Sequence, residues 1–293
     1  MEVESVTITS RLDSEYAIEV AEKTFKLLKR KGVRVILEEN LAKRLGEKKG
    51  INIKEANSNM IIVVGGDGTV LRTANLIKEK EIPLLTINAG TVGFLSEINP
   101  TELEDKISTV LKGNYRIEEC TRIKGTIQNK TSTEALKEIT ITKTYIKRDA
   151  LNEIAIITGT PLKVINLTVK KDGNQLFSGG GDGVIISTTT GATAYALSAG
   201  GPIIDPQLDV FVVVYLAPLK INQRPMVIPS NSRIEVEINH DGSDGMIIAD
   251  GQEHIKTPVG TKIILEKSEN KTRFIRIKRN FYEKLHKRLI KDV

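Results

Sequence analysis

The stretch IIVVGGDGTV, residues 61 to 70, joins a run of apolar residues to a glycine-rich turn that contains one acid. The apolar run predicts a buried β-strand, and we expect a helix to begin at about Thr69. A strand that ends in Gly65 and Gly66 and leads into a helix brings backbone N–H groups to the carboxyl edge of a sheet, which favours phosphate. We therefore expect an α/β fold in which Gly65, Gly66, Gly68 and Thr69 bind a phosphate donor.

Asp67 is electrostatically unfavourable beside a bound phosphate unless it has a specific task. Two tasks would offset the repulsion: holding a phosphate-bound Mg²⁺, or accepting the proton of a hydroxyl that attacks phosphorus. Arg72, near the end of the first helical turn, can neutralise phosphate charge and joins the donor-binding set. The alternative is a helix cap, because Asp followed by Gly and Thr is common in turns. The motif matches neither the Walker pattern nor the Rossmann fingerprint.

Two domains are expected from the pattern around this stretch. Residues 5 to 100 alternate short apolar runs with helical patterns, which predicts a doubly wound parallel sheet. Ser14 is expected to cap the first helix and Gly32 to end it. After Pro100 and one helix the chain has many short strands, which predicts a mostly β, sandwich-like domain. We expect an α/β domain over residues 1–100, joined by about 265–293, and a β domain over 101–264.

Composition narrows the class of protein. The chain has 293 residues, of which 40% are apolar and 27% charged, as in ordinary soluble proteins. No apolar run approaches the roughly 18 residues of a membrane helix, and the N-terminus does not resemble a secretory leader, so a cytoplasmic protein is expected. A single cysteine, Cys120, and three histidines give no metal-ligand spacing, so we expect no metal held by protein side chains.

The formal charge of +6 arises in the C-terminal tail, because residues 271 to 293 carry nine Lys or Arg against two acids. A polyanion-binding tail is one interpretation. We favour a strand followed by a solvated helix. Aromatic residues make up only 4% of the chain and Trp is absent, so stacking platforms for single-stranded nucleic acid are scarce and nucleic acid is not expected as a partner.

Several segments resemble one family of kinases. GGDGT (65–69) is shared by NAD kinases, by diacylglycerol and sphingosine kinases and, in a close variant, by phosphofructokinases. The resemblance to NAD kinases is specific, and it runs in order from about residue 60 to 252. It is carried by NAGTVGFLSEI (88–98), LNEIAI (151–156), GDGVIISTTTGATAYALSAGGPIID (181–205), PLKINQRPMVIP (218–229) and ADGQ (249–252).

These segments also suit a nucleotide on physical grounds. TTTGATAY (188–195) combines small side chains, which let the backbone approach a flat ligand, with hydroxyls that can bind ring nitrogens or ribose. The alternative is a tight strand-to-helix turn with Ala-rich packing. Asn152 and Glu153 suit the two hydroxyls of a ribose, but equally a polar strand start. Asp182 in GGGD is compatible with a hairpin turn, and Phe94 with a buried Phe.

The resemblance implies an NAD kinase that transfers the γ-phosphoryl group of ATP, or of polyphosphate, to the 2′-hydroxyl of the adenosine ribose of NAD. Asp67 would be the catalytic base, and Mg²⁺ would enter with ATP. By resemblance, Phe94 contacts adenine, Asn152 and Glu153 the nicotinamide nucleotide, and Asp182 its nicotinamide end. A homodimer or homotetramer is also implied. The residues that would bind NAD are Gly68, Arg72, Phe94, Asn152, Glu153, Lys163, Asp182, Thr190, Thr193, Ala194, Tyr195, Ser198, Ala217 and Gln252.

Two departures and three alternatives remain open. Many relatives carry an arginine where this chain has Gly180, and a serine where it has Ala192, so one contact is absent or supplied elsewhere. A lipid or sphingoid-base kinase would need an apolar acyl groove in place of the hydroxyl-rich segment. A catalytically silent dinucleotide-sensing protein would not need Asp67. A polyanion-binding module would rest on the basic tail alone.

Overall fold

The computed structural model describes residues 3–80, 82–90, 93–135, 138–220 and 222–290, with the side chains of 129–146 and 289–290 left aside. It forms two compact units: unit 1 comprises Met1–Cys120 and Lys271–Val293, and unit 2 comprises Thr121–Asn270. The chain passes between the units within two long strands, β5 (Arg116–Ala135) and β16 (Lys262–Arg276). The division therefore falls inside strands, whereas the sequence suggested boundaries near residues 100 and 264.

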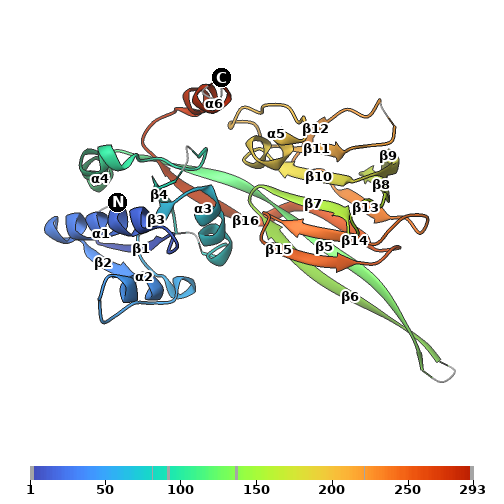
Figure 1. The fold of residues 1–293 in the computed structure, drawn as a ribbon, viewed down its shortest axis with the longest axis horizontal. Coiled ribbons are helices and arrows are strands. Elements are labelled where there is room, and N and C mark those ends of the chain that lie inside the picture. The colour runs from blue at the N-terminus through green and yellow to red at the C-terminus, as the bar shows by residue number, and fades with distance from the viewer. Residues whose placement is uncertain (1–2, 81, 91–92, 136–137, 221, 291–293) are drawn as a thin grey trace. The chain divides into compact units, whose positions relative to one another are not determined.

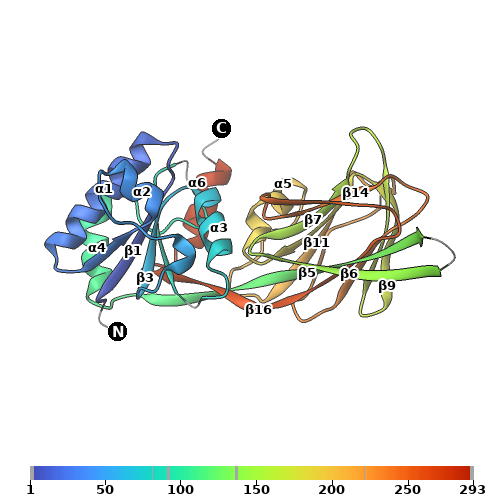
Figure 2. The ribbon, with the colours of Figure 1, turned by 90° about the horizontal axis from the view of Figure 1, so that it is seen from below.

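Unit 1 is the α/β domain that the sequence predicts. Its strands run in the order β2, β1, β3, β4 and the end of β16, and every pairing is parallel. Helices surround this sheet (Figures 1 and 2). The elements are β1 (Ser5–Ser10), α1 (Glu15–Arg30), β2 (Arg34–Leu37), α2 (Glu39–Arg44), a 3₁₀ turn (Ile53–Glu55), β3 (Met60–Gly65), α3 (Asp67–Leu76), β4 (Leu84–Asn88), a 3₁₀ turn (Pro100–Glu102), α4 (Leu103–Leu111) and α6 (Phe281–Ile290).

Local signals in the sequence account for these elements. The Ser14 side chain accepts the N–H of Ala17 at the start of α1, and Gly32 takes a φ of 77° just after its end, as predicted. Strand β3 is buried along its whole length. Ile62 and Val64 belong to the core beneath α1, and the intervening residues are buried on the other face. A strand covered on both faces is typical of a doubly wound sheet.

Unit 2 is mostly β, as the sequence predicts. One sheet has the order β12, β11, β10, β7, β14, β15 and is antiparallel. The other contains the first part of β16 with β13, β8 and β9, and β5 pairs with β16 and β6. The remaining strands are β6 (Glu138–Ala150), β7 (Glu153–Thr158), β8 (Ile165–Lys171), β9 (Asn174–Gly181), β10 (Gly183–Thr188), β11 (Val210–Leu216), β12 (Met226–Pro229), β13 (Ile234–Ile238), β14 (Gly245–Ala249) and β15 (Glu253–Thr257).

Alternation along the strands of unit 2 builds a sandwich-like core. Val184 and Ile186 of β10 pack in a cluster with Ile165, Val236 and other residues of the second sheet. Ile185 faces the opposite way, into a smaller cluster with residues of the short helix α5 (Tyr195–Ser198). Figure 1 shows α5 beside β10 and β11. Strand β10 is thus covered on both faces, and its two ends carry the residues that the resemblance assigns to NAD.

Candidate functional site

Asp67 is the first residue of α3, directly after the glycines that end β3. Its carboxylate accepts the N–H of Phe94 at Oδ2 (3.0 Å) and the N–H of Leu95 at Oδ1 (3.2 Å). The helix-cap interpretation is therefore wrong, because the side chain binds the backbone of a different loop. An ionised carboxylate can accept about four hydrogen bonds, so two loop donors leave acceptor capacity for a substrate hydroxyl.

Gly65 and Gly93 are needed around Asp67 for space and not for unusual backbone angles. None of Gly65, Gly66 and Gly68 takes a positive φ. A Cβ at Gly65 would lie 2.6 Å from Thr69 Oγ1, and one at Gly93 would lie 2.1 Å from Asp67 Oδ1. A Cβ at Gly66 or Gly68 would meet nothing within 4 Å, so the side of the turn away from the protein is open. Arg72 is exposed on α3.

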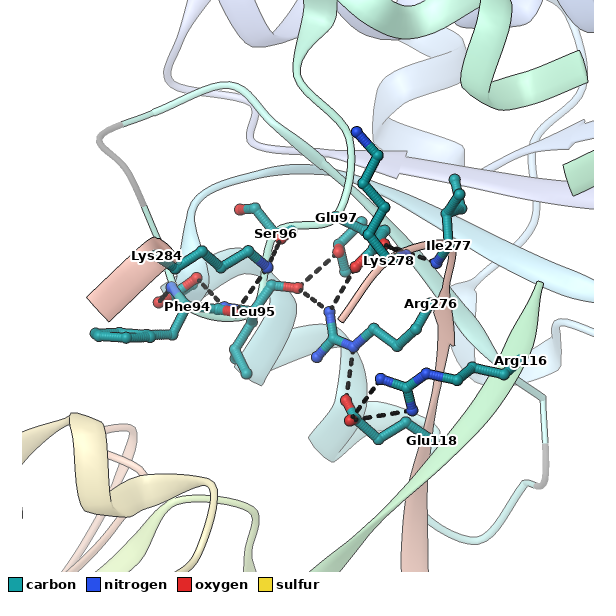
Figure 3. Close-up of polar contacts among 12 residues, drawn as sticks. Phe94, Leu95, Ser96, Glu97, Arg116, Glu118, Arg276, Ile277, Lys278 and Lys284 are labelled. Atoms are coloured by element: carbon teal, nitrogen blue, oxygen red, sulfur yellow. Dashed lines mark hydrogen bonds and ion pairs between the residues drawn. The ribbon is translucent and has the colours of Figure 1, made fainter. Parts of the chain in front are cut away.

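The loop Phe94–Glu97, which we call the carboxylate-binding loop, is held by the C-terminal segment (Figure 3). Lys284 Nζ donates to the carbonyl of Phe94 (3.3 Å) and to that of Ser96, and Arg276 Nη1 donates to the carbonyl of Leu95 (3.0 Å). Burial lowers the pKa of Lys284 to about 8, and the neighbouring Arg276 charge acts in the same direction. This loop therefore presents N–H groups to Asp67 and carbonyls to buried cations.

In unit 2, Asn152 and Glu153 lie at the start of β7 and are held through their backbone. Asp250 accepts the N–H groups of Leu151 (2.9 Å), Asn152 (2.7 Å) and Glu153 (3.3 Å). Asn152 and Glu153 are each only 7% exposed, yet Asn152 Oδ1 and Glu153 Oε2 have no hydrogen-bond partner among the described residues. Buried unpaired oxygens are rare in proteins, so this pair is suited to a ligand that brings donors.

Burial raises the pKa of Glu153 to about 8, and the charge of Asp250 acts in the same direction. A carboxyl group in such surroundings is stable when it is protonated or when it receives hydrogen bonds from a ligand. Glu153 therefore has a strong preference for a donor such as a ribose hydroxyl.

The turn after β10 packs directly on this pair. Thr188 Oγ1 donates to the carbonyl of Leu151 (2.6 Å) and accepts the N–H of Gly191 (3.1 Å). A Cβ at Gly191 would lie 2.1 Å from the carbonyl oxygen of Asn152, so only glycine fits there. The structure thereby brings the hydroxyl-rich segment to the Asn152 end of the sheet. It contains Thr190, Thr193, Ala194, Tyr195 and Ser198, with Tyr195 and Ser198 exposed.

Other predicted residues divide between the two ends of β10. Gln252 lies in the turn after β14, at the Asn152 end, because Ala249 pairs with Ile154. Asp182 lies at the Gly183 end, where its N–H donates to the carbonyl of Leu216. Six residues at about 3.3 Å each separate the ends by about 20 Å. Lys163 and Ala217 are also placed at the Asp182 end, and both are exposed.

The hairpin interpretation of GGGD is wrong, because the two strands that flank Asp182 belong to different sheets. Strand β9 pairs with β8, and β10 pairs with β7 and β11. At Gly180, a Cβ would lie 2.6 Å from both Asn166 Oδ1 and Val164 Cγ1. A larger residue at this position would require those side chains to move.

Sequence reasoning missed the residues that hold the site in place. Asp250 lies within the ADGQ segment, and its burial beside exposed turn residues is a signal that only the structure provides. In the sequence, Arg276 and Lys284 lie in the basic C-terminal tail and Glu97 in the NAGTVGFLSEI segment. No motif assigned any of the three a role. Among the described residues, no group of three or more His, Cys, Asp or Glu is placed to hold a metal ion. Asp67 is the carboxylate at the glycine turn, and a Mg²⁺ that arrives with phosphates and water needs only one or two such ligands.

Comparison with known proteins identifies relatives along nearly the whole chain. Sequence models of the ATP-NAD kinase N-terminal domain and C-terminal domain match residues 6–115 and 151–277. An NAD kinase from Methanothermobacter thermautotrophicus is 35% identical over 287 residues, which are 97% of this chain and 96% of that protein. An NAD kinase from Archaeoglobus fulgidus, solved in complex with ATP, has a TM-score of 0.74 and 27% identity over 96% of this chain and 98% of that one. Yeast NADH kinase, solved with NADH, shares the fold with a TM-score of 0.86 at 22% identity, covering 99% of this chain and 88% of that one.

Proposed function

The chain belongs to the NAD kinase family, and from this premise we propose how its two units divide the phosphorylation of NAD to NADP. The family assignment rests on models that match both parts of the chain and on a relative of nearly equal length. The enzyme is a phosphotransferase with NAD as acceptor. We propose ATP as the donor, which the name of the matched family and the ATP complex of the Archaeoglobus fulgidus enzyme support.

Asp67 acts on the acceptor hydroxyl. Its carboxylate accepts the proton of the 2′-hydroxyl of the adenosine ribose while the 2′ oxygen forms a bond to the γ-phosphorus. The bond between the γ-phosphorus and the bridging oxygen breaks, and ADP leaves with the electron pair. Because a carboxylate is a weak base toward an alcohol, the positioning of Asp67 contributes more than its basicity.

The glycine turn binds the donor. Backbone N–H groups at the start of α3 and the helix dipole favour the triphosphate, and the open space beside Gly66 and Gly68 accommodates it. Arg72 adds a positive charge on the exposed side of α3. Mg²⁺ that enters with ATP would neutralise charge on the phosphates, and the triphosphate and water would supply its oxygen ligands.

Asn152 and Glu153 bind NAD through ribose hydroxyls. The observation that supports this is the pair of buried oxygens without partners, which two adjacent hydroxyl donors would satisfy. Thr190, Thr193 and Ser198 supply further hydroxyls at the same end of the sheet.

The observation that carries the assignment of Asp67 is its carboxylate fixed by two backbone donors at the glycine turn. Asp67→Asn keeps the size and loses the proton acceptor, so we expect kcat to fall roughly 10²- to 10⁴-fold. The dissociation constant of NAD, measured by calorimetry, should stay within about twofold. Normal turnover by this variant would exclude Asp67 as the base.

A coupled assay of NADP formation distinguishes the donors and the remaining alternatives. With NAD fixed, ATP, other nucleoside triphosphates and polyphosphate are offered in turn. We expect NADP with ATP. NADP only with polyphosphate would replace the proposed donor, and NAD binding without NADP would indicate a dinucleotide-sensing protein. A sphingoid base or diacylglycerol offered in place of NAD should not be phosphorylated.

We also propose a homodimer or homotetramer in the cytoplasm. Unit 2 exposes large apolar side chains, among them Leu162, Ile203, Leu208 and Leu219, which favour association. The two ends of β10 carry predicted NAD contacts about 20 Å apart, and a second copy would allow each end to serve a different site. Among the described residues, the structure has no helix with the length and apolar character needed to span a bilayer.

A further inference from the structure

The C-terminal helix α6 packs on the carboxylate-binding loop, Phe94–Glu97, through one buried cation and an aromatic cluster. Lys284 is partly exposed as a residue, but its Nζ reaches inward to the carbonyls of Phe94 and Ser96. The Phe94 ring lies 6.1 Å from the Phe281 ring, and the Arg288 guanidinium lies 4.9 Å from the Phe94 ring centroid. These contacts place Phe281, Lys284 and Arg288, which share one face of α6, against one short loop.

The end of β16 holds the same loop at Leu95 and Glu97. Arg276 donates to the carbonyl of Leu95 and pairs with Glu97 at 3.3 Å. Glu97 accepts the backbone N–H groups of Ile277 (2.7 Å) and Lys278 (3.1 Å). Arg276 also binds Glu118, as Figure 3 shows. Every residue from Phe94 to Glu97 therefore has a contact with the C-terminal segment.

The peptide groups of this loop join the C-terminal segment to Asp67. Phe94 donates its N–H to Asp67 and accepts from Lys284, and Leu95 donates its N–H to Asp67 and accepts from Arg276. Thr86 of β4 adds one further donor to the carbonyl of Leu95. The Phe94 carbonyl and the Leu95 N–H belong to one planar peptide group, so a displacement of that carbonyl moves a donor of the Asp67 carboxylate.

Lys284 is an unfavourable choice for stability alone. Its hydrogen-bond acceptors among the described residues are carbonyls and not a carboxylate, so its charge is buried with partial compensation. The drop of its pKa to about 8, caused first by burial and then by the Arg276 charge, shows the same cost. An apolar side chain of similar length would bury as much surface without the cost of removing a charge from water. The ammonium group is therefore best explained by what it fixes.

We propose that Lys284 is a positioning residue for the phosphoryl transfer, which orients the carboxylate-binding loop so that its N–H groups set the Asp67 carboxylate. This inference rests on the proposed role of Asp67. It assigns to the basic C-terminal tail a task inside the enzyme: several of its other cations are paired, Lys271 and Arg273 with Glu119, and Lys287 with Glu283.

The test compares Lys284→Met with Lys287→Met in the full-length enzyme. Both substitutions remove one positive charge from α6, but Lys287 is exposed and pairs with Glu283 of the same helix. We expect Lys284→Met to lower kcat about 10- to 100-fold, because misplacement of a catalytic group by about 1 Å is enough for such a loss. The KM for NAD should stay within about twofold, and the melting temperature should not fall. Lys287→Met should match the wild type in all three.

The pH profile of kcat, measured at saturating NAD, gives a second readout. The groups that face Lys284 are Arg276 on β16, Glu118 on β5, Glu97 in the loop and Asp67 on α3. Lys284 is charged below about pH 8 and loses its proton above it, which weakens the hydrogen bonds to the carbonyls. The wild type should therefore lose turnover above about pH 8. The Lys284→Met variant should lack this decline.

A double-mutant cycle separates this proposal from a general structural role. If Lys284 acts through Asp67, Lys284→Met should lower kcat less than about threefold in the Asp67→Asn background. A loss as large as in the wild-type background would overturn the proposal, as would a normal kcat of the single variant. If Asp67→Asn itself turned over normally, the proposed function would fail first. Should Lys284→Met not fold, Lys284→Arg replaces it, because a guanidinium keeps the charge but is larger and planar, with its donors in a fixed fork that does not match the position of the ammonium.

Discussion

Asp67 in unit 1 follows a buried strand and Glu153 in unit 2 begins one, and their carboxyl groups have opposite surroundings. Asp67 receives two backbone N–H groups from a loop that Lys284 and Arg276 hold from behind. Glu153 is 7% exposed, and its Oε2 has no partner among the described residues. The protein itself supplies hydrogen-bond donors to the Asp67 carboxylate. The unpaired oxygen of Glu153 is left for donors that a ligand would bring.

This difference matches two kinds of work. A group that takes part in a chemical step gains most from fixed geometry, which the donors to Asp67 provide. A group that binds a substrate gains specificity when its hydrogen-bonding capacity is satisfied only by that substrate. Buried unpaired oxygens disfavour molecules that lack matching donors. Unit 2 also fixes a carboxylate, that of Asp250, but uses it to hold the backbone of Asn152 and Glu153. The backbone that carries the two unpaired oxygens is therefore held in place by Asp250.

The largest effect on kcat is expected from displacing the Asp67 carboxylate. Gly93→Ala places a Cβ 2.1 Å from Asp67 Oδ1, so the carboxylate must leave its position. We expect kcat to fall about 10²-fold or more, with the KM for NAD within about threefold. Steady-state kinetics at several NAD concentrations measure both.

Gly90→Ala is the matched control for this substitution. Its Cβ would lie 3.6 Å from the Cα of Gly66, which is an ordinary contact. Turnover within about threefold of the wild type is expected. Equal losses in the two alanine variants would show that the loop as a whole is sensitive, and that the geometry of Asp67 has no special importance.

A second prediction concerns the pH dependence of stability that Glu153 causes. The folded protein keeps the Glu153 proton up to about pH 8, whereas the unfolded chain loses it near the ordinary value of 4.5. The contribution of Glu153 to stability is therefore fully present below pH 4.5 and is lost as the pH rises to 8, by up to about 1.4 kcal/mol per pH unit. Glu153→Gln removes this loss, so the free energy of unfolding of the variant should rise relative to that of the wild type from pH 5 to pH 8.

Denaturant unfolding at four pH values measures that gain, with Glu104→Gln on the exposed surface of α4 as the control. The control should show no trend of this kind. A constant difference between Glu153→Gln and the wild type across the range would mean that Glu153 is ionised in the folded protein, like an ordinary surface acid.

The smallest expected effect concerns NAD binding by the same variant. Glu153→Gln keeps an oxygen acceptor but loses the charge, and hydrogen bonds to a charged acceptor are about 1 kcal/mol stronger. We expect the KM for NAD to rise about fivefold at pH 9, where the wild-type carboxyl is ionised, and less at pH 7. kcat should change little. A drop in kcat with unchanged KM would reverse the roles of the two carboxyl groups.

Local patterns in the sequence were sufficient to predict the framework of this site. The run of apolar residues before Gly65, the cap at Ser14 and the alternation in unit 2 are all set by neighbours in the chain. The turn after β3 and the acid within it were predicted for the same reason. Two edge strands, β12 and β15, were not predicted, because charged and proline-rich edges lack a buried alternation.

The partners of the site residues could not be predicted, because they are distant in sequence. Asp67 binds N–H groups 27 and 28 residues away, and Lys284 binds carbonyls 190 and 188 residues away. Backbone N–H and carbonyl groups carry no sequence signature, so no motif marks these contacts. Asp250 likewise serves residues about 100 positions earlier in the chain. Physical reasoning on the sequence located the acids, and the structure was needed to show which of them the protein fixes.

The most direct test of the role of Asp67 is a crystal structure of the enzyme with NAD bound, in which one distance is measured. It joins the 2′ oxygen of the adenosine ribose to the nearer carboxylate oxygen of Asp67. We expect a hydrogen bond of about 2.6 to 3.2 Å, with the N–H groups of Phe94 and Leu95 still on the carboxylate. A 2′ oxygen out of hydrogen-bond reach of Asp67, with another protein acceptor beside it, would contradict the assignment of the base.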